Sequence, residues 1–134
     1  MNYSEKKYLG IDWGEKRIGL ALGDDENKLA SPFCVAAQAS EVIDIINKEK
    51  IDFIIIGQPV KMSGAKNNFT EGFEDFLNFI KNNCNIPVEL IDERLTSKAA
   101  DALSGTKKTK ASRDSLAAML ILQSYFDKNN GRNF

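Results

Sequence analysis

The chain has 134 residues, of which 43% are hydrophobic and 28% are charged, and its net charge at pH 7 is −1. This length suits one domain over residues 1–134, and the composition is typical of a soluble globular protein rather than a disordered one. Because there is no histidine, Ser-His and Cys-His nucleophiles, HExxH zinc sites and histidine general bases are excluded. Hydrolytic chemistry would need carboxylates, lysines, hydroxyls or metals bound by oxygen.

The first part of the chain is predicted to form three hairpin-connected strands. Residues 8–13 read as the first strand, and Gly14 starts a tight turn into a second strand over 17–23. The second strand alternates large apolar residues with small ones, which is the period of a strand. A third strand over 29–35 contains Pro32, so it should lie at a sheet edge or carry a break.

Helices and strands alternate in the rest of the chain. Ser40 is expected to cap a helix that runs to about Lys50. Residues 51–56 are a continuous apolar run, typical of a strand buried on both faces, and Gly57 should end it. Apolar spacing predicts a helix over 69–80. The remaining predicted elements are a strand over 87–91, a short helix over 97–103, a lysine-rich loop over 104–111 and a final helix capped by Ser112 that runs to about Lys128.

The predicted order is therefore β-β-β-α-β-α-β-α-α. This order indicates an α/β fold, with a five-stranded mixed sheet and helices on both faces. In such sheets the functional site lies beyond the carboxyl ends of the parallel strands. We therefore expect the ends of the first, fourth and fifth strands to converge, at Asp12, at Gly57 and at Asp92 or Glu93.

Acidic residues end two of these strands. Asp12 ends the first strand, where a carboxylate is costly to bury unless it is paired or binds a metal. It could equally be a turn residue that accepts hydrogen bonds from the backbone before Gly14. Asp92 and Glu93 should point to opposite faces of the fifth strand, so only one of them can join Asp12. Both could also be solvated loop acids, one of them paired with Arg94.

Asp114 lies near the start of the final helix, on its apolar face. The helix dipole favours an acid in the first turn, but it does not explain this choice of face. Asp12, Asp114 and an acid of the fifth strand could bind Mg²⁺ or Mn²⁺ through oxygen. Two such ions roughly 4 Å apart can cleave a phosphodiester bond without a histidine. The apolar residues that share the helical stripe of Asp114 are Ala117, Ala118, Ile121, Leu122 and Tyr125.

Three segments together resemble the YqgF/RuvX family: GIDWGEKRIGLA at 10–21, DERLTS at 92–97 and DSLAAMLILQSY at 114–125. The first motif alone also occurs in sugar kinases and other actin-like ATPases, but the three in this order cover nearly the whole chain. The resemblance implies a ribonuclease H-like nuclease that matures the 5′ end of 16S rRNA. It also implies that Asp12, Glu93 and Asp114 are the catalytic residues and metal ligands, for two Mg²⁺ or Mn²⁺ ions.

Two segments depart from the family pattern. The loop after the fourth strand usually reads GLPxxxDGS, but residues 57–64 read GQPVKMSG, so the acid is absent and Gln58 replaces an apolar residue. The usual Ser-Asp after the second strand is Gly23-Asp24 here. Both changes concern expected substrate contacts and leave the three acids intact.

Basic side chains in the segments expected around the site could neutralise substrate phosphates. Any one lysine could equally be ordinary solvated surface, whereas Arg17 and Arg94 flank the expected strand ends. The net charge of −1 shows no overall basic excess. The candidates for nucleic-acid binding are Arg17, Arg94, Lys107, Lys108, Lys110 and Arg113, with Lys61, Lys66 and Lys98 in the same segments.

Three other functions compete with an RNA-processing nuclease. An actin-like kinase needs two lobes to enclose a nucleotide, and 134 residues supply only one. A Holliday junction resolvase acting on branched DNA would need a dimer to cut two strands symmetrically, so either a monomer or a homodimer is possible. A non-catalytic RNA-binding ribosome-assembly factor could keep the same fold.

The sequence also bears on location and redox state. No apolar run reaches the roughly 18 residues that a membrane helix needs, and the start of the chain does not read as a signal peptide. We therefore expect a cytoplasmic protein without membrane contact. Cys34 and Cys84 are far apart and have no CxxC spacing, so we expect them to be buried free thiols.

Overall fold

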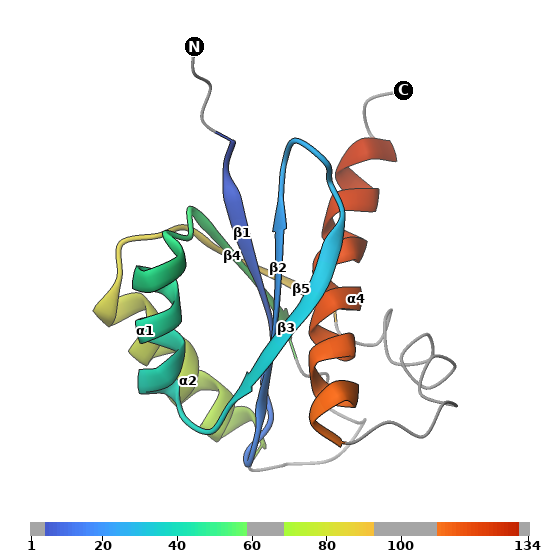
Figure 1. Ribbon diagram of the computed structural model, residues 1–134. Coiled ribbons are helices and arrows are strands. Elements are labelled where there is room, and N and C mark those ends of the chain that lie inside the picture. The colour runs from blue at the N-terminus through green and yellow to red at the C-terminus, as the bar shows by residue number, and fades with distance from the viewer. Residues whose placement is uncertain (1–4, 59–68, 93–109, 132–134) are drawn as a thin grey trace.

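The computed structural model describes residues 5–58, 69–92 and 110–131 (Figure 1). Within these ranges strands and helices alternate after an initial run of strands, as the sequence predicts. The predicted helix over 97–103 lies outside the described residues. The described elements are β1 (Lys7–Asp12), β2 (Ile18–Asp24), β3 (Ala30–Ala36), α1 (Ala39–Glu49), β4 (Phe53–Gln58), α2 (Phe69–Asn83), β5 (Val88–Asp92) and α4 (Lys110–Gly131).

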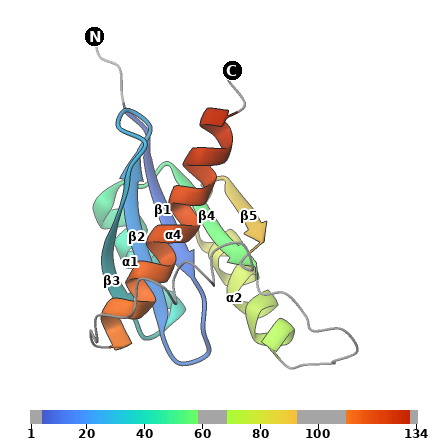
Figure 2. The ribbon, with the colours of Figure 1, turned by 90° about the vertical axis from the view of Figure 1, so that its right-hand side faces the viewer.

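The described strands form one five-stranded sheet in the order β3-β2-β1-β4-β5. β1 pairs antiparallel with β2, and β2 with β3, whereas β1, β4 and β5 run parallel. Figure 2 shows α4 crossing β1 and β2 on one face, with α1 and α2 on the other. The predicted mixed sheet with helices on both faces is therefore confirmed.

The alternation of β1 divides its residues between two apolar clusters. Leu9 and Ile11 belong to the larger cluster, with residues of α1 and α2. Tyr8 packs instead against the smaller cluster, which contains residues of α4. Because alternate residues of a strand share a face, Gly10 and Asp12 lie on the α4 face with Tyr8.

Helix α4 lies directly against bare strand backbone. A Cβ added at Gly10 would lie 2.8 Å from the Cβ of Leu122 and 2.9 Å from the carbonyl oxygen of Ala118. A Cβ added at Gly19 would collide with the carbonyl group of Asp114. The small residues that alternate along β2 therefore leave the space that α4 fills. The buried side of α4 confirms the predicted stripe, with Ala118, Ile121 and Leu122 at 0% exposure.

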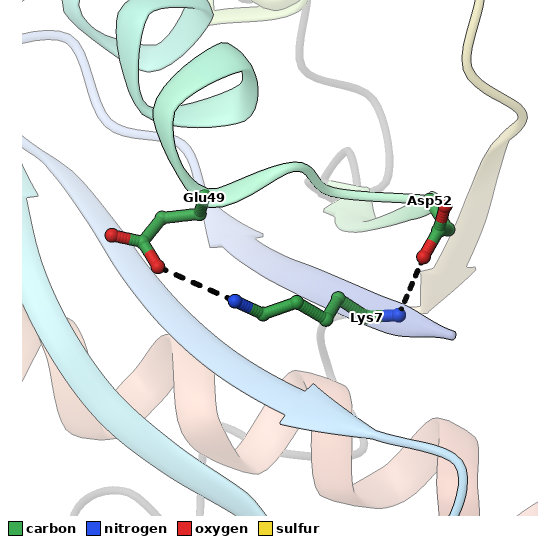
Figure 3. Close-up of polar contacts among 3 residues, drawn as sticks. All are labelled: Lys7, Glu49 and Asp52. Atoms are coloured by element: carbon green, nitrogen blue, oxygen red, sulfur yellow. Dashed lines mark hydrogen bonds and ion pairs between the residues drawn. The ribbon is translucent and has the colours of Figure 1, made fainter. Parts of the chain in front are cut away.

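Lys7 fixes the start of β1 against the chain before β4 (Figure 3). Its backbone N–H donates to Asp52 Oδ2 at 2.9 Å, and the Asp52 N–H donates to the Lys7 carbonyl at 2.8 Å. Its Nζ lies 3.4 Å from Glu49 Oε1 at the end of α1. β4 begins at Phe53 and not at the predicted residue 51, because the N–H of Ile51 donates to the carbonyl of Ile46 in α1 at 3.1 Å instead of to a neighbouring strand.

Strand β4 also ends later than predicted. Gly57 lies inside β4 and pairs with Ile91, and the strand continues to Gln58, which pairs with Asp92. The adjacent β5 supplies backbone partners there, so a glycine does not end the strand. Pro32 lies in the edge strand β3 beside a register irregularity, which confirms the expectation for it.

Neither serine predicted as a helix cap holds that position. Helix α1 begins at Ala39, and its N-cap residue Gln38 makes no side-chain capping hydrogen bond. The carboxylate of Glu41 instead accepts the N–H of Ala37 at 2.7 Å. Helix α4 begins at Lys110, so Ser112 is inside the helix, and Lys110 and Ala111 of the predicted loop belong to it as well; the rest of that loop lies outside the described residues. Lys110, Ala111 and Arg113 are all strong helix formers, which favours this earlier start.

The two cysteines are free thiols, as expected, but each is half-buried rather than fully buried. Burial raises the pKa of the Cys34 thiol, because loss of water disfavours the thiolate. The Sγ of Cys84 donates to the carbonyl of Ile80 at 3.3 Å. No described helix is long and apolar enough to cross a bilayer.

Gly19→Ala tests the close contact of α4 with β2. The added methyl would meet the Asp114 carbonyl, and overpacking of this kind costs about 1–3 kcal/mol of unfolding free energy. Urea denaturation measures the loss. The control Ser31→Ala, on the exposed side of the edge strand, should change stability by no more than about 0.5 kcal/mol. A Gly19→Ala protein as stable as the parent would show that α4 does not lie this close.

Candidate active site

The carboxyl ends of β1, β4 and β5 lie side by side, as the sequence predicts (Figure 2). In the parallel register Ile11 pairs with Ile56, and Gln58 pairs with Asp92. Asp12 is the last residue of β1 and is half-buried. It pairs with Gly19 across the antiparallel β1–β2 ladder.

Asp12 and Asp114 come from distant parts of the chain to the same face of the sheet. Directly opposed residues of an antiparallel pair share a face, with Cβ atoms about 5 Å apart. Gly19 faces α4 and lies beneath Asp114, so its partner Asp12 faces α4 as well. Asp114 follows the first turn of α4, which contains no acid. The helix dipole therefore does not account for this aspartate.

Arg17 forms an ion pair with Asp114 that the sequence did not reveal. Its Nε lies 2.7 Å from Asp114 Oδ2, and the two side chains are 41% and 26% exposed. Arg17 was predicted to bind nucleic acid, and Asp114 to bind metal. One signal for the pair was present, because Arg17 and Gly19 are two residues apart and share the face on which α4 packs.

The two acids that end the fifth strand are not equivalent. Leu90 packs with the cluster beneath α1 and α2, and Ile91 with the cluster beneath α4. By alternation Asp92 points to the α1 and α2 face, away from Asp12 and Asp114. Glu93 lies outside the described residues. Among the described residues no group of three acidic, histidine or cysteine side chains is arranged to hold a metal.

The two carboxylates on the α4 face nevertheless suit a hard divalent cation in their donor chemistry. Both supply only oxygen, the donor that Mg²⁺ and Mn²⁺ prefer. Two like charges on one face also repel each other until a cation neutralises them. Arg17 already supplies one positive charge to Asp114.

Only part of the predicted basic surface is described. Arg113 is exposed and directly precedes Asp114. The backbone of Lys110 begins α4, but its side chain is outside the described set. The other lysine and arginine candidates lie outside the described residues: Lys61, Lys66, Arg94, Lys98, Lys107 and Lys108.

Trp13, which follows Asp12, anchors the end of β1 to α2. Its ring makes a T-shaped contact with Phe73, with centroids 5.9 Å apart. A Cβ added at Gly72 would lie 3.0 Å from an atom of this ring. Gly72 is unfavourable for the helix in isolation, but it provides the space that the indole occupies.

Comparisons with known proteins agree with this architecture. A family model described as "RuvX: Holliday junction resolvase" matches residues 6–128. A protein of Maridesulfovibrio salexigens named "Putative pre-16S rRNA nuclease" is 35% identical over 130 residues, which cover 89% of this chain and 96% of that protein. A protein of Flavobacterium psychrophilum with the same name is 35% identical over 133 residues, covering 91% of this chain and 97% of that protein.

Among solved structures, Thermus thermophilus RuvC in complex with a Holliday junction substrate has a similar fold. The TM-score is 0.63 at 13% sequence identity, and the match covers 94% of this chain and 96% of that chain. Identity this low supports the fold and not a shared substrate. The likeness confirms the ribonuclease H-like fold that the sequence resemblance implied.

Proposed function

This chain belongs to the RuvX family, and we propose that it is a metal-dependent nuclease that processes the 5′ end of pre-16S rRNA in the cytoplasm. The relatives that match over most of their length are named as nucleases. The structural observation that supports the proposal is the placement of Asp12 and Asp114 on one face, at the carboxyl end of β1.

Asp12 and Asp114 would hold Mg²⁺ or Mn²⁺ together with a third acid. Asp92 points to the opposite face of the sheet, so we assign the third position to Glu93. A divalent ion, or a pair of them, supplies an activated water and stabilises the leaving oxygen in phosphodiester hydrolysis. The protein's own contribution is to keep the carboxylates on a rigid strand end and a rigid helix, so that they are oriented before the substrate arrives.

Basic residues around the carboxylates would bind the phosphate backbone. Arg113 is exposed beside Asp114, and Arg94, Lys107, Lys108 and Lys110 are close to the proposed ligands in sequence. Phosphate contacts position a nucleic acid without reading its sequence. Any preference for the processing site would therefore depend on the shape of the substrate or on other residues.

The names of the relatives favour RNA as the substrate of this chain. The relatives named for pre-16S rRNA are 35% identical to this chain, whereas the junction-bound RuvC is 13% identical. The description of the family model supports a second candidate function, a Holliday junction resolvase. A resolvase would act as a homodimer, because two strands are cut symmetrically. The RNA-processing enzyme could be a monomer.

Cleavage of a labelled 16S rRNA precursor, beside a synthetic four-way junction, tests the proposed function. With Mg²⁺ or Mn²⁺ we expect cleavage of the precursor. Asp12→Asn, Glu93→Gln and Asp114→Asn should each lose more activity than the roughly 10–100-fold typical of an outer-shell partner. The matched control Asp92→Asn should keep the parent rate, because Asp92 faces away from the site.

The results separate the candidate functions. Cleavage of the junction but not the precursor would favour the resolvase. Binding of RNA without cleavage by the parent would favour a non-catalytic assembly factor. Loss of activity in Asp92→Asn but not in Glu93→Gln would show that the third ligand is wrongly assigned.

Replacing Lys107, Lys108 and Lys110 with alanine tests the basic segment before the site. Each lost phosphate contact should reduce the salt dependence of binding by about 0.7–0.9 log units per decade of salt. The dissociation constant should rise for RNA of any sequence, which filter binding at several salt concentrations measures. Alanine at Lys48 and Lys81, both exposed on the helices of the other face, is the control. Equal affinity and salt slope in the triple variant and the parent would place the binding surface elsewhere.

A further inference from the structure

We propose that Arg17 is a positioning residue that holds the Asp114 carboxylate by Oδ2 and thereby presents Oδ1 to the metal ion. This inference rests on the proposed function, because it assumes that Asp114 is a metal ligand. It differs from a role in phosphate binding, which the position of Arg17 in the sequence alone suggests.

The backbone and the side chain of Asp114 are restrained by different neighbours. Gly19 packs against the carbonyl group of Asp114. This contact fixes the position of the Asp114 backbone relative to β2. The 2.7 Å contact from Arg17 Nε fixes the carboxylate itself, and it is a charge-assisted hydrogen bond of the stronger kind. Together they restrain both the backbone and the carboxylate of Asp114, on the face of the sheet that Asp12 shares.

The backbone of Arg17 is restrained as well. A Cβ added at Gly14 would lie 2.8 Å from the Arg17 carbonyl oxygen, so the turn between β1 and β2 is tight at this point. The same short turn therefore joins Asp12, at the end of β1, to the arginine that restrains Asp114. Both proposed ligands are positioned by one hairpin.

The ion pair is suited to orientation more than to stability. The Arg17 side chain is 41% exposed, and an ion pair this open to water contributes only about 0–1 kcal/mol to folding. Metal-binding carboxylates are themselves usually hydrogen-bonded by a second residue, which orients the ligand atoms. A carboxylate held through one oxygen can still bind a cation through the other.

The test measures Mn²⁺ binding to the metal-free protein by calorimetry, without any nucleic acid. Arg17→Met removes the hydrogen bond and the charge but keeps most of the apolar stem. We expect the dissociation constant for Mn²⁺ to rise about 10–100-fold, as for other outer-shell partners. The control Lys16→Met removes the same charge from the exposed neighbouring residue and should leave the affinity unchanged.

The direction of the change decides between roles for Arg17. Loss of a positive charge by itself favours a bound cation, so weaker Mn²⁺ binding in an Arg17→Met protein with the parent's melting temperature reflects lost orientation. Tighter binding would show that Arg17 competes with the metal, and unchanged binding would leave it a phosphate contact; either result overturns the proposal. A parent protein that does not bind Mn²⁺ would contradict the metal site itself, and this role with it.

Discussion

The structure depends on the direct contact between α4 and the backbone of β1 and β2. Gly10 and Gly19 allow this contact, because a Cβ at either position would meet atoms of the helix. The side chains of Ala118, Ile121 and Leu122 are completely buried in the interface. Since Asp114 lies on the same side of the helix, the packing that closes the core also brings this carboxylate over Gly19, whose strand partner is Asp12.

Contacts at both halves of α4 hold the helix in this position. Toward its C-terminal end, Gln123 Oε1 accepts the N–H of Ala30 at 2.9 Å, and Gln123 Nε2 donates to the carbonyl of Lys28 at 3.1 Å. Near its N-terminal end, Asp114 accepts the hydrogen bond from Arg17. The hydrogen bonds of Gln123 connect the helix to the start of β3, far from the carboxylates. The hydrogen bond from Arg17 lies at the proposed site, so the same helix serves both packing and chemistry.

The sequence predicted the parts of the fold that follow from periodicity. The alternation of large and small residues predicted β2, and the apolar stripe through Asp114 predicted the side of α4 that packs on the sheet. Strand alternation predicted opposite faces for Asp92 and Glu93; the structure places Asp92 on the α1 and α2 face, and Glu93 lies outside the described residues. Local contacts were harder to predict. Ser40 and Ser112 are good capping residues, but Glu41 satisfies the backbone before α1 and favourable residues extend α4 upstream. The pair between Arg17 and Asp114 joins residues 97 positions apart, a contact that no local pattern specifies.

The central claim is that Asp12 and Asp114 together bind a divalent cation, and thermal unfolding with and without Mn²⁺ tests it most directly. A ligand that binds only the folded protein stabilises it by about 2.7 kcal/mol at a hundred times its dissociation constant. We predict that Mn²⁺ raises the melting temperature of the parent, and that Asp12→Asn and Asp114→Asn each abolish the increase. An unchanged melting temperature in the parent, or the same increase in all three proteins, would contradict the claim.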